Sequence, residues 1–330
     1  MTDSLTNSEI GSLAPIVLFV YNRPMHTEKT ISALMGNPLA KESHLVVFSD
    51  GPKSPEDSQA VEKVREIVGE LKGFKSVEVN FQEHNLGLAN SVISGVTKII
   101  SQHGKAIVLE DDLEVSARFL EFMNSALVHY ERQDSVFSIG GYQFPETTMT
   151  IPSGYEYDTY SGFRCCSWGW ATWADRWSQV NWNIEDTDSF FDNPVERDRF
   201  NRGGQDLSIS LLEQRRAQID SWAIRYCYSH FTNDKYCIYP TKTLVRNIGL
   251  DGSGIHCGVD PSREHKVLDN EWCPTVFCDG VFPDEEMSDR FAHAFNANRI
   301  AQKFGARFVP KKLRNKLAVS YFWILNARKR

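Results

Sequence analysis

The sequence predicts an α/β protein with a mostly parallel central sheet flanked by helices. Two observations predict it. Between residues 15 and 140, short apolar runs alternate with stretches of helical periodicity, which is typical of a parallel sheet covered by helices. The chain is also 330 residues long, with 41% apolar and 12% aromatic residues, so it can bury a sizeable core.

Five apolar runs in this first half are predicted as buried strands, because each is rich in β-branched or aromatic residues and ends at polar breakers. They cover residues 16–21, 45–49, 77–81, 106–109 and 136–139. A further strand-like run covers residues 236–240, in the second half of the chain.

Helices are expected between these strands. Ser54 can cap a helix over 54–71, with Pro55 at its first position. Apolar residues between Leu88 and Ile100 form one helical face, and Ser116 caps a helix whose apolar positions extend to Tyr130. Two more helices are expected over 205–216 and 221–231.

The regular alternation of apolar runs and helical stretches ends after Gly140, and this change in pattern predicts a division of the chain. Residues 155–182 hold five of the eight tryptophans with little regular periodicity, and we expect loops that face a ligand there. We therefore predict a flexible N-terminus over 1–14, a first half over 15–145, a second half over 146–260 and a C-terminal helical extension over 261–330.

The charge distribution excludes some partners. The net charge is −7, but residues 301–330 hold nine Lys and Arg and no acidic residue, so the first 300 residues are strongly acidic. An acidic body does not suit nucleic-acid binding. The longest apolar run near the N-terminus is too short to span a bilayer, and no basic signal segment precedes it, so we expect a cytoplasmic protein.

The basic C-terminal tail has an amphipathic pattern. Leu313, Leu317, Tyr321 and Ile324 lie near one helical face, beside several lysines and arginines. Such a helix suits peripheral contact with an anionic membrane. A terminal helix that packs on the body of the protein is the alternative.

The seven cysteines are an odd number without a Cys-x-x-Cys pair, so reduced thiols are expected. A zinc site built from His256, Cys257, Cys273 and Cys278 is an alternative, although the spacing matches no known pattern.

The most informative segment runs from Ile107 to Glu114, where a buried strand ends in three consecutive acids, Glu110, Asp111 and Asp112. Ligands of open α/β sheets bind at the carboxyl ends of the strands. Adjacent carboxylates repel one another, and a hard divalent cation with diphosphate oxygens relieves this repulsion. The alternative is an acidic turn that caps the following helix.

Polar residues follow the other predicted strands. The chain lacks a G-x-G-x-x-G or Walker A motif after its first strand. Instead Arg23 stands where it can reach a phosphate or form a structural Arg-Pro turn. Asp50 follows the second strand, as an acceptor for a base N–H or as part of an Asp-Gly turn. Asn85 and Gly87 follow the third strand.

These segments, together with 167–173, 220–222 and 244–257, resemble nucleotide-sugar glycosyltransferases of the GT-A fold, over roughly residues 15–260. The chain is most similar to bacterial family two-like sugar transferases. It is more distantly similar to the N-acetylglucosaminyltransferase I family, whose metal motif is also Glu-Asp-Asp. The resemblance implies a GT-A (Rossmann-like) fold, in which the first half binds the nucleotide sugar and the second half is the acceptor-binding, catalytic half.

The resemblance also implies residue roles. Asp112 is the direct ligand of Mn²⁺ or Mg²⁺, and His256 is a second ligand or a structural histidine. The nucleotide sugar contacts Asn22, Arg23, Asp50, Asn85, Gly87, Glu110 and Asp111. The sugar and acceptor cleft is lined by Trp168, Gly169, Trp170 and Trp222, unless these rings pack in a core.

Asp220-Ser221-Trp222 resembles the motif that supplies the catalytic base in inverting members. The register departs from the pattern, because the residue immediately before the tryptophan is Ser221 and the acid lies one position further back. Glu213 and Asp206 are rival bases, and Asp220 is alternatively a helix cap.

The implied activity is metal-dependent, inverting transfer of a sugar, most simply from a UDP-sugar, to a hydroxyl group. The acceptor is a saccharide or lipid-linked saccharide of surface polysaccharide synthesis. Two alternatives are a sugar-phosphate nucleotidyltransferase, whose glycine-rich N-terminal signature is missing, and a catalytically inactive relative that binds saccharide or nucleotide.

Overall fold

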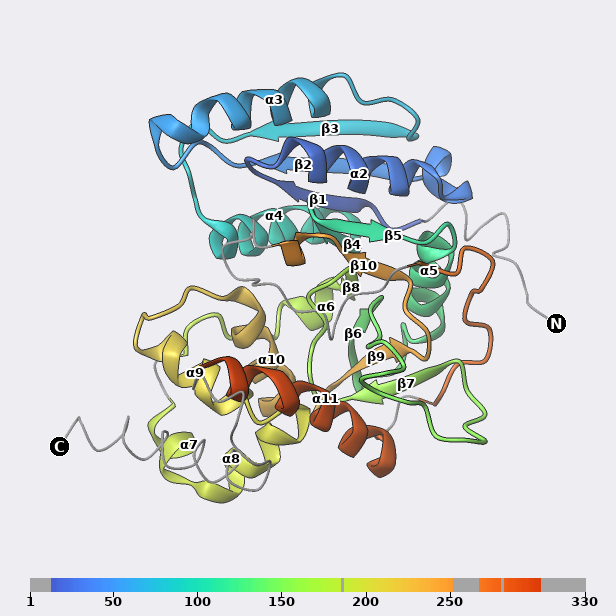
Figure 1. The fold of residues 1–330 in the computed structure, drawn as a ribbon, viewed down its shortest axis with the longest axis vertical. Coiled ribbons are helices and arrows are strands. Elements are labelled where there is room, and N and C mark those ends of the chain that lie inside the picture. The colour runs from blue at the N-terminus through green and yellow to red at the C-terminus, as the bar shows by residue number, and fades with distance from the viewer. Residues whose placement is uncertain (1–12, 185–186, 252–266, 280–281, 304–330) are drawn as a thin grey trace.

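The computed structural model describes residues 13–184, 187–251, 267–279 and 282–303 (Figure 1). Residues 1–12 of the predicted N-terminal segment, His256 and Cys257 of the predicted metal sites, and the basic tail after residue 303 lie outside the described residues. Within the described part of the chain, no helix combines the length and apolar character needed to cross a membrane.

The described chain forms an α/β fold around an eight-stranded sheet in which most neighbouring strands are parallel. The sheet order is β3 (Ser76–Phe81), β2 (His44–Ser49), β1 (Ile16–Val20), β4 (Lys105–Glu110), β8 (Trp170–Trp173), β6 (Val136–Gly140), β9 (Tyr236–Pro240) and β7 (Thr159–Gly162). Only β8 and β7 run antiparallel to their neighbours in this sheet. A separate antiparallel pair joins β5 (Leu113–Val115) to β10 (Val245–Asn247). The predicted fold class is confirmed.

Helices cover both faces of the sheet. One core lies under α2 (Pro24–Met35), α3 (Ser58–Gly69) and α5 (Phe119–His129). The other lies under α4 (Leu88–His103), α9 (Leu207–Arg215) and α10 (Trp222–Thr232). The remaining helices are α6 (Ala174–Trp177), α7 (Asp188–Asp192), α8 (Pro194–Phe200) and α11 (Glu285–Lys303), and short 3-10 turns cover Pro38–Glu42, Pro55–Asp57, Asn201–Gly203 and Gly249–Asp251.

Strand β1 shows why the sheet is buried on both sides. Ile16, Leu18 and Val20 belong to the core under α2, whereas Val17 and Phe19 belong to the core under α4. All five are at most 4% exposed, so the strand is a continuous apolar run rather than an alternating one. Gly95 lets α4 approach closely, because an added Cβ would lie 2.7 Å from the Phe19 ring.

The six predicted strands all form, with ends that shift by one residue at most. The expectation of loops over 155–182 is wrong for β7 and β8, which are four residues each and show no periodicity of their own. Helix α2 was not predicted. Its buried positions include Thr27 and Thr30, so its inward face is only partly apolar.

Both predicted halves contribute strands to the one eight-stranded sheet. Strands β8, β9 and β7 come from the second half and share the sheet with strands of the first half. Strand β10 returns to pair with β5, directly after the three acids. Helix α11 packs against the same sheet, with the Phe291 ring 4.9 Å from the Tyr239 ring.

Buried His230 predicts a dependence of stability on pH. The His230 side chain is 0% exposed. Its Nδ1 donates to the Tyr226 carbonyl oxygen at 2.9 Å, and its Nε2 shares a hydrogen bond of 2.9 Å with the Ser138 hydroxyl, so the neutral ring has a partner at both nitrogens. Burial lowers the pKa of His230 from 6.5 to about 4.

Since the unfolded chain takes up this proton first, we expect the free energy of unfolding to fall as the pH drops from 6.5 toward 4, by roughly 3 kcal/mol from this residue. Urea unfolding across that range checks the slope. The His230→Gln variant should show a shallower dependence than the native chain, and parallel curves would contradict the assignment.

Candidate functional site

The strand order reverses between β1 and β4, and this reversal locates the candidate site. The chain passes from β1 outward to β2 and β3, then returns to β4 on the other side of β1. In open α/β sheets the crevice outside the carboxyl ends of two such strands takes the ligand. Arg23 lies after β1, and Asp111 and Asp112 lie after β4, so these side chains meet at that crevice.

Arg23 is clamped between two of the three acids. Its Nη2 is in close contact with the Asp111 carboxylate, and its Nη1 lies 2.9 Å from Asp112 Oδ2. Burial by itself would lower the pKa of Arg23, but the charges of Asp111 and Asp112 outweigh it and raise that pKa. The guanidinium is therefore the cation that neutralises this acidic turn.

Backbone contacts hold the two aspartates in place. The Thr30 hydroxyl donates to the Asp111 carbonyl oxygen at 2.9 Å, and the Ile248 N–H donates to the Asp112 carbonyl oxygen at 2.9 Å. A Cβ on Gly249 would lie 2.2 Å from Asp112 Oδ2, so only glycine fits at that position. The turn after β10 thus closes over the acids. No local sequence pattern predicted this contact between the turn and Asp112.

Glu110 is the third acid and ends β4. Burial, followed by the charges of Asp112 and Asp111, raises the pKa of Glu110 to about 8, against the opposing effects of Arg23 and a hydrogen bond from the Trp222 side chain. Burial also raises the pKa of Asp111. Trp222 is the first residue of α10, so its hydrogen bond brings the start of that helix to the carboxyl end of β4.

Asp50 organises the loop that follows β3. Its Oδ1 accepts from the N–H groups of Gly51 at 2.9 Å and Leu86 at 2.8 Å, and its Oδ2 accepts from the Gly87 N–H at 3.0 Å. The side chain is buried. These bonds give Asp50 a structural role in both loops, and the base contact expected for it stays a prediction.

The other predicted nucleotide-side residues also tie loops together. The Asn85 side chain donates to the Gly51 carbonyl oxygen at 2.8 Å, and the Asn22 side chain donates to Asp57 at 2.8 Å. Gly87 has a φ of 77° and caps the start of α4, a conformation that favours glycine. The loops after β1, β2 and β3 therefore form one connected edge.

The tryptophans predicted to line a sugar cleft are mostly in the core, and this corrects the expectation for two of them. Trp170 is 1% exposed, with its ring centre 4.9 Å from that of Trp222 and 5.7 Å from that of Trp177. Trp222 is 3% exposed. Their ring faces are covered by other aromatic side chains, so neither can stack on a pyranose.

Trp168 and Gly169 lie in the turn before β8. Trp168 is partly buried and meets the Tyr142 ring edge-on at 4.5 Å. Gly169 has a φ of 62°, and an added Cβ would lie 2.9 Å from Val245 of β10. The turn therefore packs closely on the strand that leads to the acidic site.

The three candidate bases differ in their surroundings. Asp206 is buried in a two-bond ion pair with Arg164, at 2.8 and 3.1 Å. Glu213 lies on α9. The Asp220 side chain is 60% exposed, pairs with Arg225 at 2.7 Å, and stands two residues before Trp222. Asp220 is thus the exposed acid beside the start of α10.

Within the described residues, no group of three or more His, Cys, Asp or Glu side chains is arranged to hold a metal ion. Asp111 and Asp112 nevertheless present hard oxygen donors, and Mg²⁺ is commonly held by one or two carboxylates together with substrate phosphates. The donor chemistry fits Mn²⁺ or Mg²⁺, provided that Arg23 releases the carboxylates. The predicted ligand His256 lies outside the described residues, as does part of the alternative zinc set.

No protein-family model and no curated protein matches the sequence. A mannosyltransferase from Pyrobaculum calidifontis, in complex with GDP-Man and Mn²⁺, is 10% identical with a TM-score of 0.33, over 48% of this chain and 44% of that one. The chain thus matches less than half of the mannosyltransferase. A UDP-glucose pyrophosphorylase complexed with UDP-glucose is 10% identical with a TM-score of 0.38, over 72% of this chain and 94% of that one. These distant likenesses concern the fold alone.

Removal of the Arg23 charge should expose the repulsion among the acids. The Arg23→Gln variant should lose about 3 kcal/mol of unfolding free energy at pH 8, because it leaves two buried carboxylates without their partner. The loss should shrink at pH 5. Carboxyl groups with raised pKa values bind more protons in the folded state, so their cost falls as the pH is lowered.

Urea unfolding at the two pH values measures both effects. The matched control is Arg118→Gln, which breaks the half-exposed ion pair with Glu121 and should cost less than about 1 kcal/mol. An Arg23 variant as stable as this control would contradict the clamp.

Proposed function

We propose that the chain transfers a sugar from a nucleoside diphosphate sugar to an acceptor hydroxyl, with a divalent cation held through Asp112. The observation that carries this proposal is the meeting of Arg23 with Asp111 and Asp112 where the strand order reverses. An acidic turn suits a cation, and an adjacent guanidinium suits phosphate oxygens. The two together suit a diphosphate bound with a metal ion.

In this proposal the Arg23 guanidinium can pair either with the carboxylates of Asp111 and Asp112 or with the diphosphate of the donor. Without donor, its guanidinium pairs with Asp111 and Asp112. With donor bound, Asp112 would hold the cation, and the guanidinium released from the carboxylates would contact the diphosphate through two parallel N–H groups. Bound Mn²⁺ or Mg²⁺ would offset the negative charge that develops on the leaving diphosphate.

Asp220 is the proposed base. Its carboxylate accepts the proton of the acceptor hydroxyl as the oxygen attacks the anomeric carbon, and the bond from that carbon to the diphosphate breaks on the opposite side. The configuration inverts. The exposure of Asp220 supports this choice, because Asp206 is buried in its ion pair with Arg164. The proposed donor is a UDP-sugar, with Asp50 near the base, and the proposed acceptor is a saccharide or a lipid-linked saccharide.

One observation favours a second candidate, an inactive relative that binds nucleotide or saccharide. The Arg23 guanidinium already pairs with the carboxylates of Asp111 and Asp112, so these two acids have a positively charged partner without a metal ion. Such a protein would bind nucleotide without metal and would release no nucleotide from a nucleotide sugar.

The donor site is tested by calorimetric titration of UDP, GDP and dTDP, with and without Mn²⁺. We expect Mn²⁺-dependent binding of at least one nucleotide, weakened more than about tenfold in Asp112→Asn because a metal-ligating charge is removed. Asp198→Asn, a change at an exposed acid of α8, is the charge-matched control and should bind as the native chain does. Metal-independent binding that survives Asp112→Asn would favour the inactive relative.

The base is tested by turnover with the identified donor. The Asp220→Asn variant should lose at least about 10²-fold in turnover while its donor affinity stays unchanged, because the acid acts on the acceptor. Nuclear magnetic resonance of the product should show an inverted anomeric configuration. Full turnover in this variant, or retention of configuration, would remove Asp220 from the mechanism.

A further inference from the structure

Two buried cysteines that the proposed function does not use lie against each other in the core. Cys165 belongs to the segment between β7 and β8, and Cys227 lies in the middle of α10. Their Sγ atoms are 2.9 Å apart, in a hydrogen bond that either thiol can donate. The two residues are 62 positions apart in the chain, so the tertiary fold brings these sulfur atoms together.

The adjacent Cys166 shows that the contact is specific to one thiol. Cys165 and Cys227 both belong to the core under α4, α9 and α10, whereas Cys166 belongs to the core on the other face of the sheet. The Cys166 Sγ donates to the Trp168 carbonyl oxygen at 3.5 Å. Cys165 and Cys166 are both 5% exposed, so they differ in direction and not in burial.

The geometry of the pair suits a disulfide bond. The six described cysteines are free thiols. An S–S bond is about 2.0 Å long, so the sulfur atoms of Cys165 and Cys227 have to approach by less than about 1 Å. Cys165 lies in a segment without helix or strand, which makes a movement of this size possible without a change in α10.

A positive charge beside the pair makes one thiol the better nucleophile. Burial by itself would raise the pKa of Cys227, but the hydrogen bond with Cys165 and the charge of the Arg164 guanidinium outweigh it and lower that pKa. Burial raises the pKa of Cys165. Because the thiolate is the reactive form of cysteine, Cys227 is the thiol that attacks an oxidant first.

We propose that Cys165 and Cys227 are a redox-active pair, which hydrogen peroxide converts into a disulfide bond between α10 and the segment before β8. The Cys227 thiolate attacks one peroxide oxygen, the O–O bond breaks, and hydroxide leaves a sulfenic acid on Cys227. The Cys165 sulfur then attacks the Cys227 sulfur, the S–O bond breaks, and the hydroxyl group leaves with a proton as water. The two thiols lose two electrons, and the peroxide becomes two water molecules.

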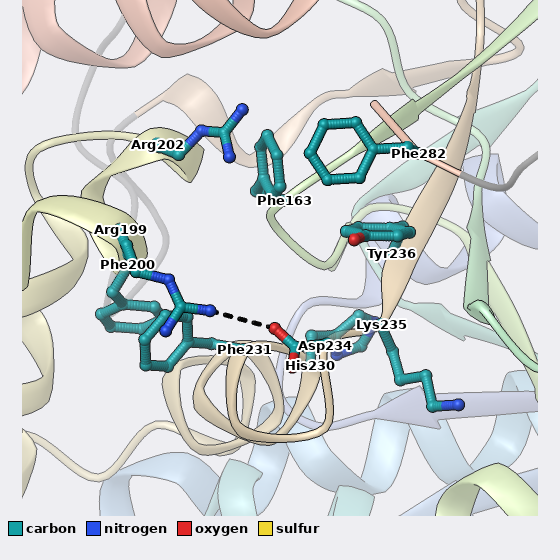
Figure 2. Close-up of a pocket in the computed structure, with 10 residues that line it drawn as sticks. All are labelled: Phe163, Arg199, Phe200, Arg202, His230, Phe231, Asp234, Lys235, Tyr236 and Phe282. Carbon is teal, nitrogen blue, oxygen red and sulfur yellow. Dashed lines mark hydrogen bonds and ion pairs between the residues drawn. The ribbon is translucent and has the colours of Figure 1, made fainter. Parts of the chain in front are cut away.

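The disulfide would fix a segment that follows α10 along its length. The Cys165 Sγ lies 3.4 Å from the carbonyl oxygen of Ala223, in the first turn of α10. At the other end of the helix, Phe163 and His230 line one small pocket (Figure 2). Residues 163–165 thus contact both the beginning and the end of α10, and a bond to Cys227 would join them to its middle.

The test is peptide mapping of the full chain by mass spectrometry after exposure to hydrogen peroxide. Trypsin cleaves after Arg164 and Arg176, and after Arg225 and Lys235, which releases peptides 165–176 and 226–235. We expect these peptides to appear as one species that is two hydrogen atoms lighter than their sum. Treatment with dithiothreitol should separate them. Fragmentation of the linked species between its first two residues assigns the bond in the native chain itself.

Three variants identify the pair independently. Cys165→Ala and Cys227→Ala should each abolish the linked species. Cys166→Ala is the matched control, because it changes an equally buried thiol of the same peptide, and it should retain the link.

A second readout is the melting temperature. Peroxide should raise it by about 5 °C in the native chain and in Cys166→Ala, because a disulfide across 62 positions restricts the unfolded chain. It should leave the melting temperatures of Cys165→Ala and Cys227→Ala unchanged. None of these readouts is an activity, so they are independent of the proposed sugar transfer.

The proposal is overturned if the two peptides stay separate after peroxide treatment of the folded chain, or if Cys227 is oxidised only to a sulfinic acid. It is also overturned if the link persists in Cys165→Ala or is lost in Cys166→Ala, since either result would assign the bond to another thiol. An unchanged melting temperature of the linked native chain would contradict the tether between α10 and the segment before β8.

Discussion

The pairing of Arg23 with Asp111 and Asp112 is the interaction on which the candidate site depends. Three carboxylates at the end of one buried strand repel one another, and the fold tolerates them because a cation reaches them from the neighbouring strand. That pairing links the turn after β1 to the turn after β4. The turn after β10, with Gly249 against Asp112, completes the enclosure.

The same pairing affects how tightly the site can bind a ligand, because a ligand of the carboxylates must displace Arg23. In the proposed function Arg23 and a divalent cation would compete for the carboxylates, so the measured affinity for a metal would include the cost of displacing the guanidinium. A diphosphate lowers that cost, because it offers the displaced guanidinium a new partner. In the proposed function, donor and cation therefore bind together more readily than either does alone, which is a form of positive coupling within one site.

Helix α10 links the core to the edge of the acidic site. Trp222 packs its ring among Trp170 and Tyr226 while its side chain bonds to Glu110, so one residue belongs both to the core and to the edge of the acidic site. Asp220 precedes the helix and His230 lies near its end, beside the pocket of Figure 2. The helix is packed in the core along its length, with buried residues from Trp222 to His230.

The sequence by itself determined the six predicted strands, the fold class and the position of the acids at the end of β4, because a strand buried on both faces is a local apolar run and its carboxyl end is where polar residues begin. It also predicted that Arg23 and the acids follow strands of one sheet. Only the tertiary structure decided that Arg23 pairs with those acids, that Asp50 bonds to backbone amides, and that Trp170 is covered by aromatic rings. It also decided that Phe163, Arg202, Tyr236 and Phe282, from four separate segments, form one pocket. Burial and pairing are set by neighbours distant in the chain, and no local pattern encodes those neighbours.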